Sequence, residues 1–338
     1  MDYQIEDADT GPQAEQIPPE APPRQIGVEA EALDRKQTAA ERMRLPRQAW
    51  RRLVLLGVVY VTVIASLLIV FDGGTRQNPF VPLVVLIAFV LETTDSAAGM
   101  GFGTGLAPLL FVLGYEPLQI VPVLLVSEML TGLIAGAVHQ NVENVAFSVR
   151  PLNEESKLLL LLVGVGSVAT LGSVVLTYVA LELSEAAIET YVSVLVLVMG
   201  VVGVSRAKLR TRIEYKPRRL VAFALLAGVN KGIGGGGYGP VITLGQILSG
   251  VYEKSAVAIT TLAEGIVSIT GVVTFLLLFH YGVPVDFRLL PSIFAGGFLA
   301  AIVAPYAVRV VPNAIWRYVI PIYAFGIGLI GLSLGLEV

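Results

Sequence analysis

The sequence contains no cysteine and only two histidines, His139 and His280. The absence of cysteine excludes disulfides, thiolate metal sites and cysteine nucleophiles. Two histidines are too few for a histidine-rich metal centre. We therefore expect neither a metal nor another cofactor, and no nucleic-acid partner.

Charged side chains are also scarce. They make up 14% of the 338 residues, whereas a soluble domain averages about 25%. Hydrophobic residues make up 55%, the mean hydropathy is +0.76, and 18 of the 49 charged residues lie within residues 1–52. Most of the remaining chain must therefore sit in a lipid bilayer. The sequence predicts an all-α membrane protein that crosses the bilayer several times.

The N-terminal segment, residues 1–52, has a different composition. Residues 1–34 are acidic and rich in proline, with almost no large apolar side chains, so they are not expected to form a packed core. A basic stretch with Trp50 follows and adjoins the first apolar run, which is typical of the cytoplasmic side of a membrane. We predict a disordered cytoplasmic tail, acidic and then basic; the alternative is a regulatory or partner-binding tail.

Apolar runs of about 20 residues predict the membrane spans. Seven are long enough: Leu53–Phe71, Leu118–Val138, Ser156–Leu181, Ala186–Val204, Ser255–Phe279, Phe287–Val310 and Ala314–Leu336. Two further regions, 82–113 and 220–248, are each split by a glycine-rich stretch. Their pieces are too short to cross about 30 Å of hydrocarbon as single helices.

The distribution of Lys and Arg indicates the direction of each span, because basic loops lie on the cytoplasmic side. Seven basic residues lie between positions 206 and 219, so this loop should be cytoplasmic, like the basic end of the tail. Both can be cytoplasmic only if 82–113 enters from outside and returns as a hairpin. The same logic makes 220–248 a hairpin that enters from the cytoplasm. The protein is then expected in the plasma membrane, with its C-terminus on the outer side.

The predicted architecture is an inverted repeat preceded by one extra N-terminal span and its loop (53–79). Each unit, 80–205 or 219–338, consists of a broken-helix hairpin plus three transmembrane helices, and a basic cytoplasmic linker, 206–218, joins them.

Matching residues support this repeat. The stretch GFGTGLAPLL (101–110) aligns with IGGGGYGPVITL (233–244), which places Pro108 against Pro240. Further along, SEMLTG (127–132) aligns with AEGIVS (263–268), which matches Glu128 with Glu264.

The two glycine-rich turns are the candidate binding site. Irregular backbone survives at membrane depth only where it is buried in protein or lines a wet cavity. In inverted-repeat transporters such breaks aim half-helix N-termini at anionic substrates. The second half-helices should begin near Thr104–Pro108 and Gly237–Pro240, since proline suits a first helical turn and glycine lets a ligand reach the backbone N–H groups. The alternative is that the glycines only allow tight turns and close packing.

Lys231 places a positive charge inside the second break. A lysine within a membrane is costly and usually functional, and beside Asn230 it could supply charge to an anion. The alternative is that Lys231 lies at the cytoplasmic rim and extends to the lipid headgroups.

Four carboxylates lie within predicted membrane segments: Glu92, Asp95, Glu128 and Glu264. Intramembrane carboxylates often relay protons, so coupling of transport to protons, or to sodium, is possible through them. Alternatively they cap exposed N–H groups of a hairpin or pair with hydroxyls such as those of Thr131 and Thr260.

The two breaks resemble a known family. GMGFGTGLAPLL (99–110) and GVNKGIGGGGYGPVITL (228–244) are similar to the glycine turns that open each repeat of the sulfite exporter TauE/SafE family, also called the toluene-sulfonate uptake permease family. The stretch SAVAITTL (255–262) resembles the start of the family's next helix. The resemblance covers about residues 80–337. The first copy departs from the pattern, because Phe102 and Thr104 interrupt its glycines.

This resemblance implies transport of a small sulfur-containing anion, such as sulfite or an organosulfonate, often outward. The resemblance implies a substrate site at the two turns, formed by Gly101, Gly103, Thr104, Gly105, Pro108, Gly234, Gly235, Gly236, Gly237 and Pro240. Asn230, Lys231 and Tyr238, in or beside the second turn, complete the predicted site.

Three classes of function compete. A secondary transporter for a small anion is favoured, working by alternating access around the two hairpins. The stretch GVNKGIGGGG lacks the ending of a P-loop, so no nucleotide motif supports primary transport. An intramembrane enzyme is disfavoured, because no aspartate follows either glycine turn and there is no HExxH motif. A channel, or a cation- or proton-coupled carrier that uses the carboxylates, is the third possibility.

Overall fold

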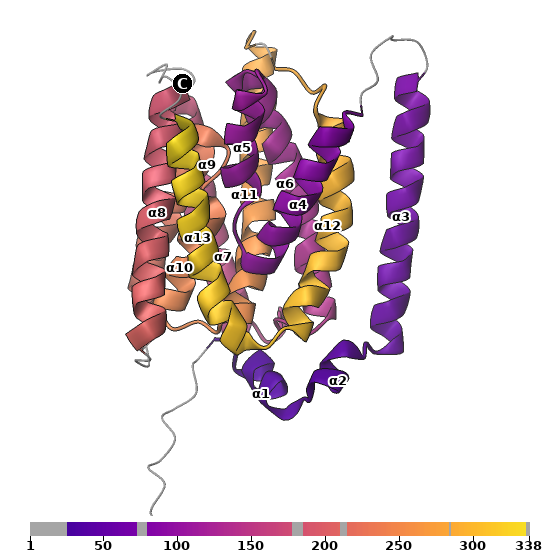
Figure 1. Ribbon diagram of the computed structural model, residues 1–338, viewed down its shortest axis with the longest axis vertical. Helices are drawn as coiled ribbons and strands as arrows, with labels where there is room; N and C mark the ends of the chain where they lie inside the picture. Colours follow the sequence, from indigo (N-terminus) through magenta and orange to yellow (C-terminus); the bar gives the residue numbers. More distant parts are fainter. Residues whose placement is uncertain (1–25, 73–79, 178–184, 210–214, 284, 336–338) are drawn as a thin grey trace, which may run out of the picture.

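The computed structural model describes residues 26–72, 80–177, 185–209, 215–283 and 285–335. Within these residues the regular secondary structure consists of helices, and the long ones lie side by side in one bundle (Figure 1). The predicted all-α membrane fold is confirmed. The helices are α1 (Val28–Lys36), α2 (Ala39–Met43), α3 (Arg47–Asp72), α4 (Pro82–Ala98), α5 (Phe102–Val112), α6 (Pro117–Asn141), α7 (Glu154–Val175), α8 (Glu185–Leu209), α9 (Pro217–Gly234), α10 (Tyr238–Leu248), α11 (Glu253–His280), α12 (Leu290–Val310) and α13 (Asn313–Gly335).

Six of the described helices are long and apolar enough to cross a membrane: α3, α6, α7, α11, α12 and α13. They coincide with six of the seven long spans predicted from the sequence. The seventh prediction, Ala186–Val204, falls on α8, whose apolar described part is Val194–Ser205.

The two broken regions fold into helix pairs with matching ends. Helix α4 ends at Gly99, which has φ of 70° and donates its N–H to the carbonyl of Asp95 at 2.6 Å. Helix α9 ends in the same way at Gly235, with φ of 72° and an N–H bond of 2.9 Å to the carbonyl of Lys231. Positive φ is strained for residues with a Cβ, so glycine is the residue that can stop a helix like this.

Each helix pair returns to the end of the bundle from which it started. The N–H of Lys216, just before α9, donates to the carbonyl of Ser249, just after α10, at 3.2 Å. Figure 1 shows α5 in the upper half of the bundle and α10 in the lower half, so the two pairs lie at opposite ends. The charge distribution predicted a hairpin in each of these regions, and the side of the membrane from which each one enters stays a prediction.

Helix contacts come in matching sets. Helix α4 packs along α12 as α9 packs along α7, and α6 contacts α12 as α11 contacts α7. Helices α6 and α11 pack on each other, as do α8 and α13. Exchanging the two units leaves this set of contacts unchanged, which is the pattern that an inverted repeat would produce. The repeat itself stays a prediction.

The predicted pairing of Pro108 with Pro240 is wrong by four residues. Helix α5 begins at Phe102, so Pro108 lies in its second half and not in its first turn, whereas Pro240 is the third residue of α10. Matching the two helix caps, Gly99 with Gly235, pairs residues 136 positions apart. The same spacing relates Glu128 to Glu264, as the sequence predicted.

Residues 26–44, called the strap below, fold across one end of the bundle beneath α6, α7, α11 and α12 (Figure 1), which differs from the disordered tail expected there. Ile26 is fully buried, and the N–H of Gly27 donates to Oε1 of Glu155 at 3.0 Å. The N–H of Tyr252 donates to the carbonyl of Ile26 at 3.3 Å. One apolar side chain and a few backbone bonds thus order a segment whose composition is otherwise typical of disorder. Residues 1–25 lie outside the described residues.

Charged groups hold the other half of the strap. Asp34 accepts from Lys254 at 2.6 Å and from Arg42 at 3.0 Å. The side chain of Arg309 donates to the carbonyl of Arg42 at 3.1 Å. Burial opposes ionisation of Asp34, but the two cations outweigh it and lower the pKa of this carboxyl below its ordinary 3.8.

Replacing Asp34 tests the attachment of the strap. Asp34→Asn leaves the ammonium of Lys254, only 4% exposed, without its carboxylate. Removing one partner of a buried pair is strongly destabilising, so trypsin cleavage of the purified protein after Arg35 and Lys36 should rise about tenfold or more. Glu31→Gln is the matched control, because it breaks only the surface pair with Arg35. Equal cleavage rates in both variants would show that Asp34 does not hold the strap.

Acid should release the strap of the unmutated chain. A lowered carboxyl pKa stabilises the docked state above the ordinary value of 3.8, and that stabilisation is lost as the pH falls through the lower folded value. Protection of the strap, measured by hydrogen exchange, should therefore be constant from pH 8 to about 4 and decline only below that. A decline between pH 7 and 5 would contradict this assignment.

Candidate functional site

The two glycine turns meet in the centre of the bundle. A methyl group added to Gly236 would lie 2.6 Å from the carbonyl carbon of Gly103, and one added to Gly239 would lie 2.6 Å from the carbonyl oxygen of Gly99. The starts of α5 and α10 are thus in direct backbone contact, which only glycine permits. The predicted site residues Gly101, Gly103, Gly235, Gly236 and Gly237 all lie in these two turns.

Two threonine hydroxyls tie the turns together. The N–H of Gly237, before the first residue of α10, donates to Oγ1 of Thr104 at 2.9 Å. In the other direction, Oγ1 of Thr243 on α10 donates to the carbonyl of Gly99 at 2.7 Å. Thr104 was predicted as a site residue, whereas Thr243 was not.

Lys231 lies in the interior of the protein and not at its rim. Its side chain is fully buried, and Nζ donates to Oε2 of Glu128 at 2.5 Å and to Oε1 of Glu264 at 3.0 Å. The ammonium also lies 5.7 Å from the ring centre of Tyr238, the first residue of α10. The alternative in which Lys231 extends to the headgroups is therefore wrong. The matched glutamates of α6 and α11 share this one cation.

Glu92 and Asp95, both on α4, complete the charged cluster. Glu92 accepts from Ser96 at 2.7 Å and from Thr131 at 3.3 Å, while Oδ1 of Asp95 accepts from the N–H of Phe102 at 3.2 Å. The hairpin-capping alternative thus describes Asp95, and the hydroxyl alternative describes Glu92. Thr260 bonds instead to Thr243 and Gln246.

The cluster holds more acids than bases. Glu92, Asp95, Glu128 and Glu264 are at most 6% exposed, and they lie within electrostatic range of one another. With Lys231 as their only described cationic partner, four negative charges and one positive would give −3 if all were ionised. Such a charge is costly in a buried site, so protons or a cation must balance part of it. Among the described residues, none of the His, Asp and Glu side chains form a group of three arranged to hold a metal ion.

Other predicted residues lie at the edge of this centre. Gly105 faces the side chain of Leu91, and Gly234 is the last residue of α9. Pro240 is buried in the first turn of α10. Asn230 is fully buried, and no described group bonds to either polar atom of its side chain.

A chain of polar groups that the sequence analysis did not find leads from this cluster towards the strap. The carbonyl of Ser96 bonds to Nε2 of His139 at 3.0 Å, and Nδ1 of His139 bonds to Asn144 at 2.9 Å. Oγ of Ser255, near the start of α11, donates to the carbonyl of Asn144 at 3.1 Å. The sequence shows these residues as polar positions in or beside apolar runs. Whether they contact one another depends on how each helix is rotated about its axis, which the sequence does not show.

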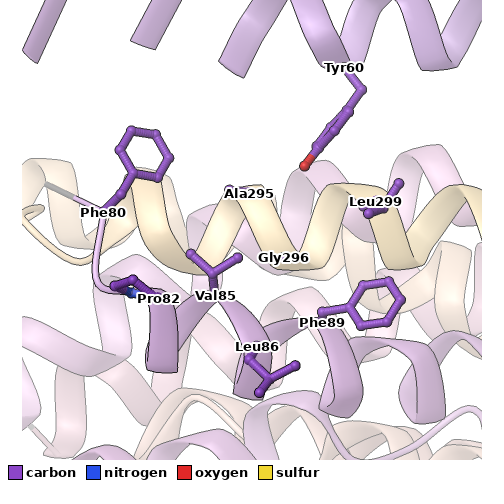
Figure 2. Close-up of a pocket in the computed structure, with 9 residues that line it drawn as sticks. All are labelled: Tyr60, Phe80, Pro82, Val85, Leu86, Phe89, Ala295, Gly296 and Leu299. Carbon is purple, nitrogen blue, oxygen red and sulfur yellow. The ribbon is translucent and has the colours of Figure 1, made fainter. Parts of the chain in front are cut away.

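An apolar groove lies on the side of the bundle, away from the charged cluster. It has a volume of about 430 Å³ and lies between α3, α4 and α12. Figure 2 shows phenylalanine, leucine and valine side chains around it, with the Tyr60 hydroxyl pointing towards α12. This lining suits a hydrocarbon chain and offers no cationic group to an anion.

The comparisons with known proteins give one match. The family model described as "Sulfite exporter TauE/SafE" matches residues 84–334, which include both turns and all five charged residues of the cluster. The strap and α3 precede the matched range. No curated protein and no solved structure matches the chain significantly.

Close contact at the crossing of the turns can be tested with a methyl group. Gly236→Ala must push apart the backbones of Gly236 and Gly103, and overpacking of this kind typically costs about 1–3 kcal/mol. The melting temperature of the purified protein should fall by several degrees. Gly164→Ala is the matched control, since a Cβ there meets no atom within 4 Å. Equal melting temperatures for Gly236→Ala and Gly164→Ala would contradict the close contact of the two turns.

Proposed function

Because the chain belongs to the sulfite exporter TauE/SafE family, it is a membrane transporter, and we propose that its cargo is a small sulfur-containing anion such as sulfite or an organosulfonate. We propose further that it is an exporter or permease of the plasma membrane. Its N-terminus and strap then lie in the cytoplasm and its C-terminus outside, following the basic residues between positions 206 and 219.

The buried ammonium of Lys231 supports an anionic cargo more than any other observation. A cation at membrane depth is retained only for a strong reason, and recognition of an anion is such a reason. Lys231 is four residues before the glycine cap of α9 and within 5.7 Å of the ring of Tyr238, so its charge adjoins the N-terminus of α10. Positive charge and a positive helix end therefore coincide.

The second turn supplies the rest of the proposed site. The first-turn N–H groups of a helix have no partner within the helix, and α10 begins with Tyr238, Gly239 and Pro240. Gly235, Gly236 and Gly237 carry no side chains that would keep an oxyanion from this backbone. Asn230, whose buried amide no described group contacts, could donate a further bond.

In the described conformation this site is closed. Glu128 and Glu264 both bond to the ammonium of Lys231, and Gly103 contacts Gly236. An arriving anion would have to replace a carboxylate at Lys231 and part the two turns. Movement of one hairpin relative to the other, first on one side of the membrane and then on the other, would give alternating access.

A cation- or proton-coupled carrier, or a channel for another small solute, is the alternative. The excess of four carboxyl groups over one ammonium favours it, because such a cluster attracts cations. The sign of the transported charge and saturation of the flux separate this alternative from an anion carrier.

Replacing Lys231 tests the anion site. For the unmutated protein, sulfite at a hundred times its dissociation constant should stabilise the fold by about 2.7 kcal/mol, a shift of several degrees in a thermal melt. Lys231→Met should remove this shift. Lys254→Met is the matched control, because it also deletes a buried lysine but one that bonds to Asp34 of the strap. Its sulfite shift should remain.

The same assay identifies the cargo and exposes a wrong assignment. Sulfate, sulfoacetate, taurine and simple carboxylates should be compared with sulfite. A sulfite shift of equal size in Lys231→Met and the unmutated protein would rule out Lys231 as the anion's partner. Stabilisation by cations alone would favour the alternative function.

A further inference from the structure

The two hairpins differ in the charge at one equivalent position. Asp95 lies four residues before the glycine cap of α4, and Lys231 lies four residues before the glycine cap of α9. Both carbonyls accept the N–H of that cap, at 2.6 and 2.9 Å respectively. The backbone is therefore alike in the two turns, but one carries a carboxylate where the other carries an ammonium.

We propose that the two turns are not equivalent: the second binds a single anion, and the first, occupied by the carboxyl group of Asp95, carries the proton that moves with that anion. This inference rests on the proposed function. It replaces the symmetrical site expected from the sequence, in which both turns bind substrate.

Asp95 already fills the place that an anion would take at the first turn. Its Oδ1 accepts from the N–H of Phe102, the first residue of α5, at 3.2 Å. A carboxylate at a helix N-terminus uses the donors and the positive helix end on which a bound anion would depend. At the second turn, the N–H of Gly237, one residue before the start of α10, donates instead to the uncharged hydroxyl of Thr104. An anion would therefore meet the carboxylate of Asp95 at the first turn, whereas at the second turn it would meet the ammonium of Lys231.

The other acids near Asp95 oppose ionisation of its carboxyl group. An arriving anion adds to this opposition. The groups within electrostatic range of Asp95 are Glu92 on its own helix, Glu128 on α6, Glu264 on α11 and the hydroxyl of Tyr323 on α13, while His139 on α6 contacts the carbonyl of the next residue, Ser96. An anion that takes Lys231 from Glu128 and Glu264 adds one negative charge and frees two carboxylates. Uptake of a proton by Asp95, which converts its carboxylate to a carboxylic acid, restores the charge of the empty site.

Polar groups also lie between the neighbourhood of Asp95 and the strap. Ser96 follows it in the chain, and its carbonyl contacts His139, which in turn contacts Asn144 close to the strap. This contact series connects the neighbourhood of the first turn with the end of the bundle where the strap lies. The second turn is not part of it.

The test is transport by the full chain in liposomes that enclose a pH-sensitive dye. Inward movement of sulfite or of the best anion from the thermal panel should acidify the lumen. Asp95→Asn keeps an oxygen that can accept from Phe102 but cannot exchange a proton. This variant should still exchange labelled anion for unlabelled anion, while its net uptake and acidification fall about tenfold or more. Asp286→Asn is the matched control, because Asp286 lies outside the charged cluster, where it bonds to Gln119 and pairs with Arg288, and its replacement should leave both activities unchanged.

Each other outcome overturns a defined statement. Anion uptake without acidification, or uptake that needs sodium, overturns the proton and leaves the proposed function standing. Acidification by Asp95→Asn at the unmutated rate overturns the role of Asp95. Equilibrium binding of two anions per chain overturns the difference between the turns. No anion flux at all from the unmutated protein, with its melting temperature intact, overturns the proposed function itself.

Discussion

The buried contact of Lys231 with Glu128 and Glu264 is the interaction on which the rest of the interior depends. An ammonium group cannot remain in a protein interior without partners, and here the partners come from α6 and α11, while the lysine comes from α9. Three helices are thus held in one relative position by a single charge. Under the proposed function this contact also has to be broken during transport, because it neutralises the ammonium that would attract the anion.

The backbone of the broken helices imposes the second constraint. A helix that stops inside a membrane leaves N–H and carbonyl groups that must be bonded within the protein. Here the hydroxyls of Thr104 and Thr243 and the carboxyl of Asp95 bond to such groups. Glycine allows the two turns to come close enough for this exchange, so the same residues that make the turns possible also make them fit each other.

Much of the fold could be predicted because it follows from hydropathy and charge. Runs of apolar residues located the spans, and the basic residues near position 210 required two hairpins. The glycine turns and the five charged residues were found because glycine clusters and charges are rare in apolar segments. The register of the hairpins was misjudged because Pro108 and Pro240 look alike in the sequence, although one lies inside its helix and the other in a first turn.

Contacts that depend on helix rotation could not be predicted. The sequence does not indicate that Thr131 bonds to Glu92 and not to Glu128, or that His139 bonds to the carbonyl of Ser96. The order in residues 26–44 was also out of reach, since it depends on the burial of Ile26 and on charge pairs with α11 and α12 that lie far along the chain.

The strap bridges parts of the bundle that belong to different halves of the predicted repeat. Glu155 lies in the first turn of α7 in the first half, whereas Tyr252, Lys254 and Arg309 belong to the second. Any widening between these halves at this end must therefore stretch a segment that is fastened to both. Under the alternating access proposed above, the chain ahead of the family's domain would limit how far that mouth can open, without touching any group of the charged cluster.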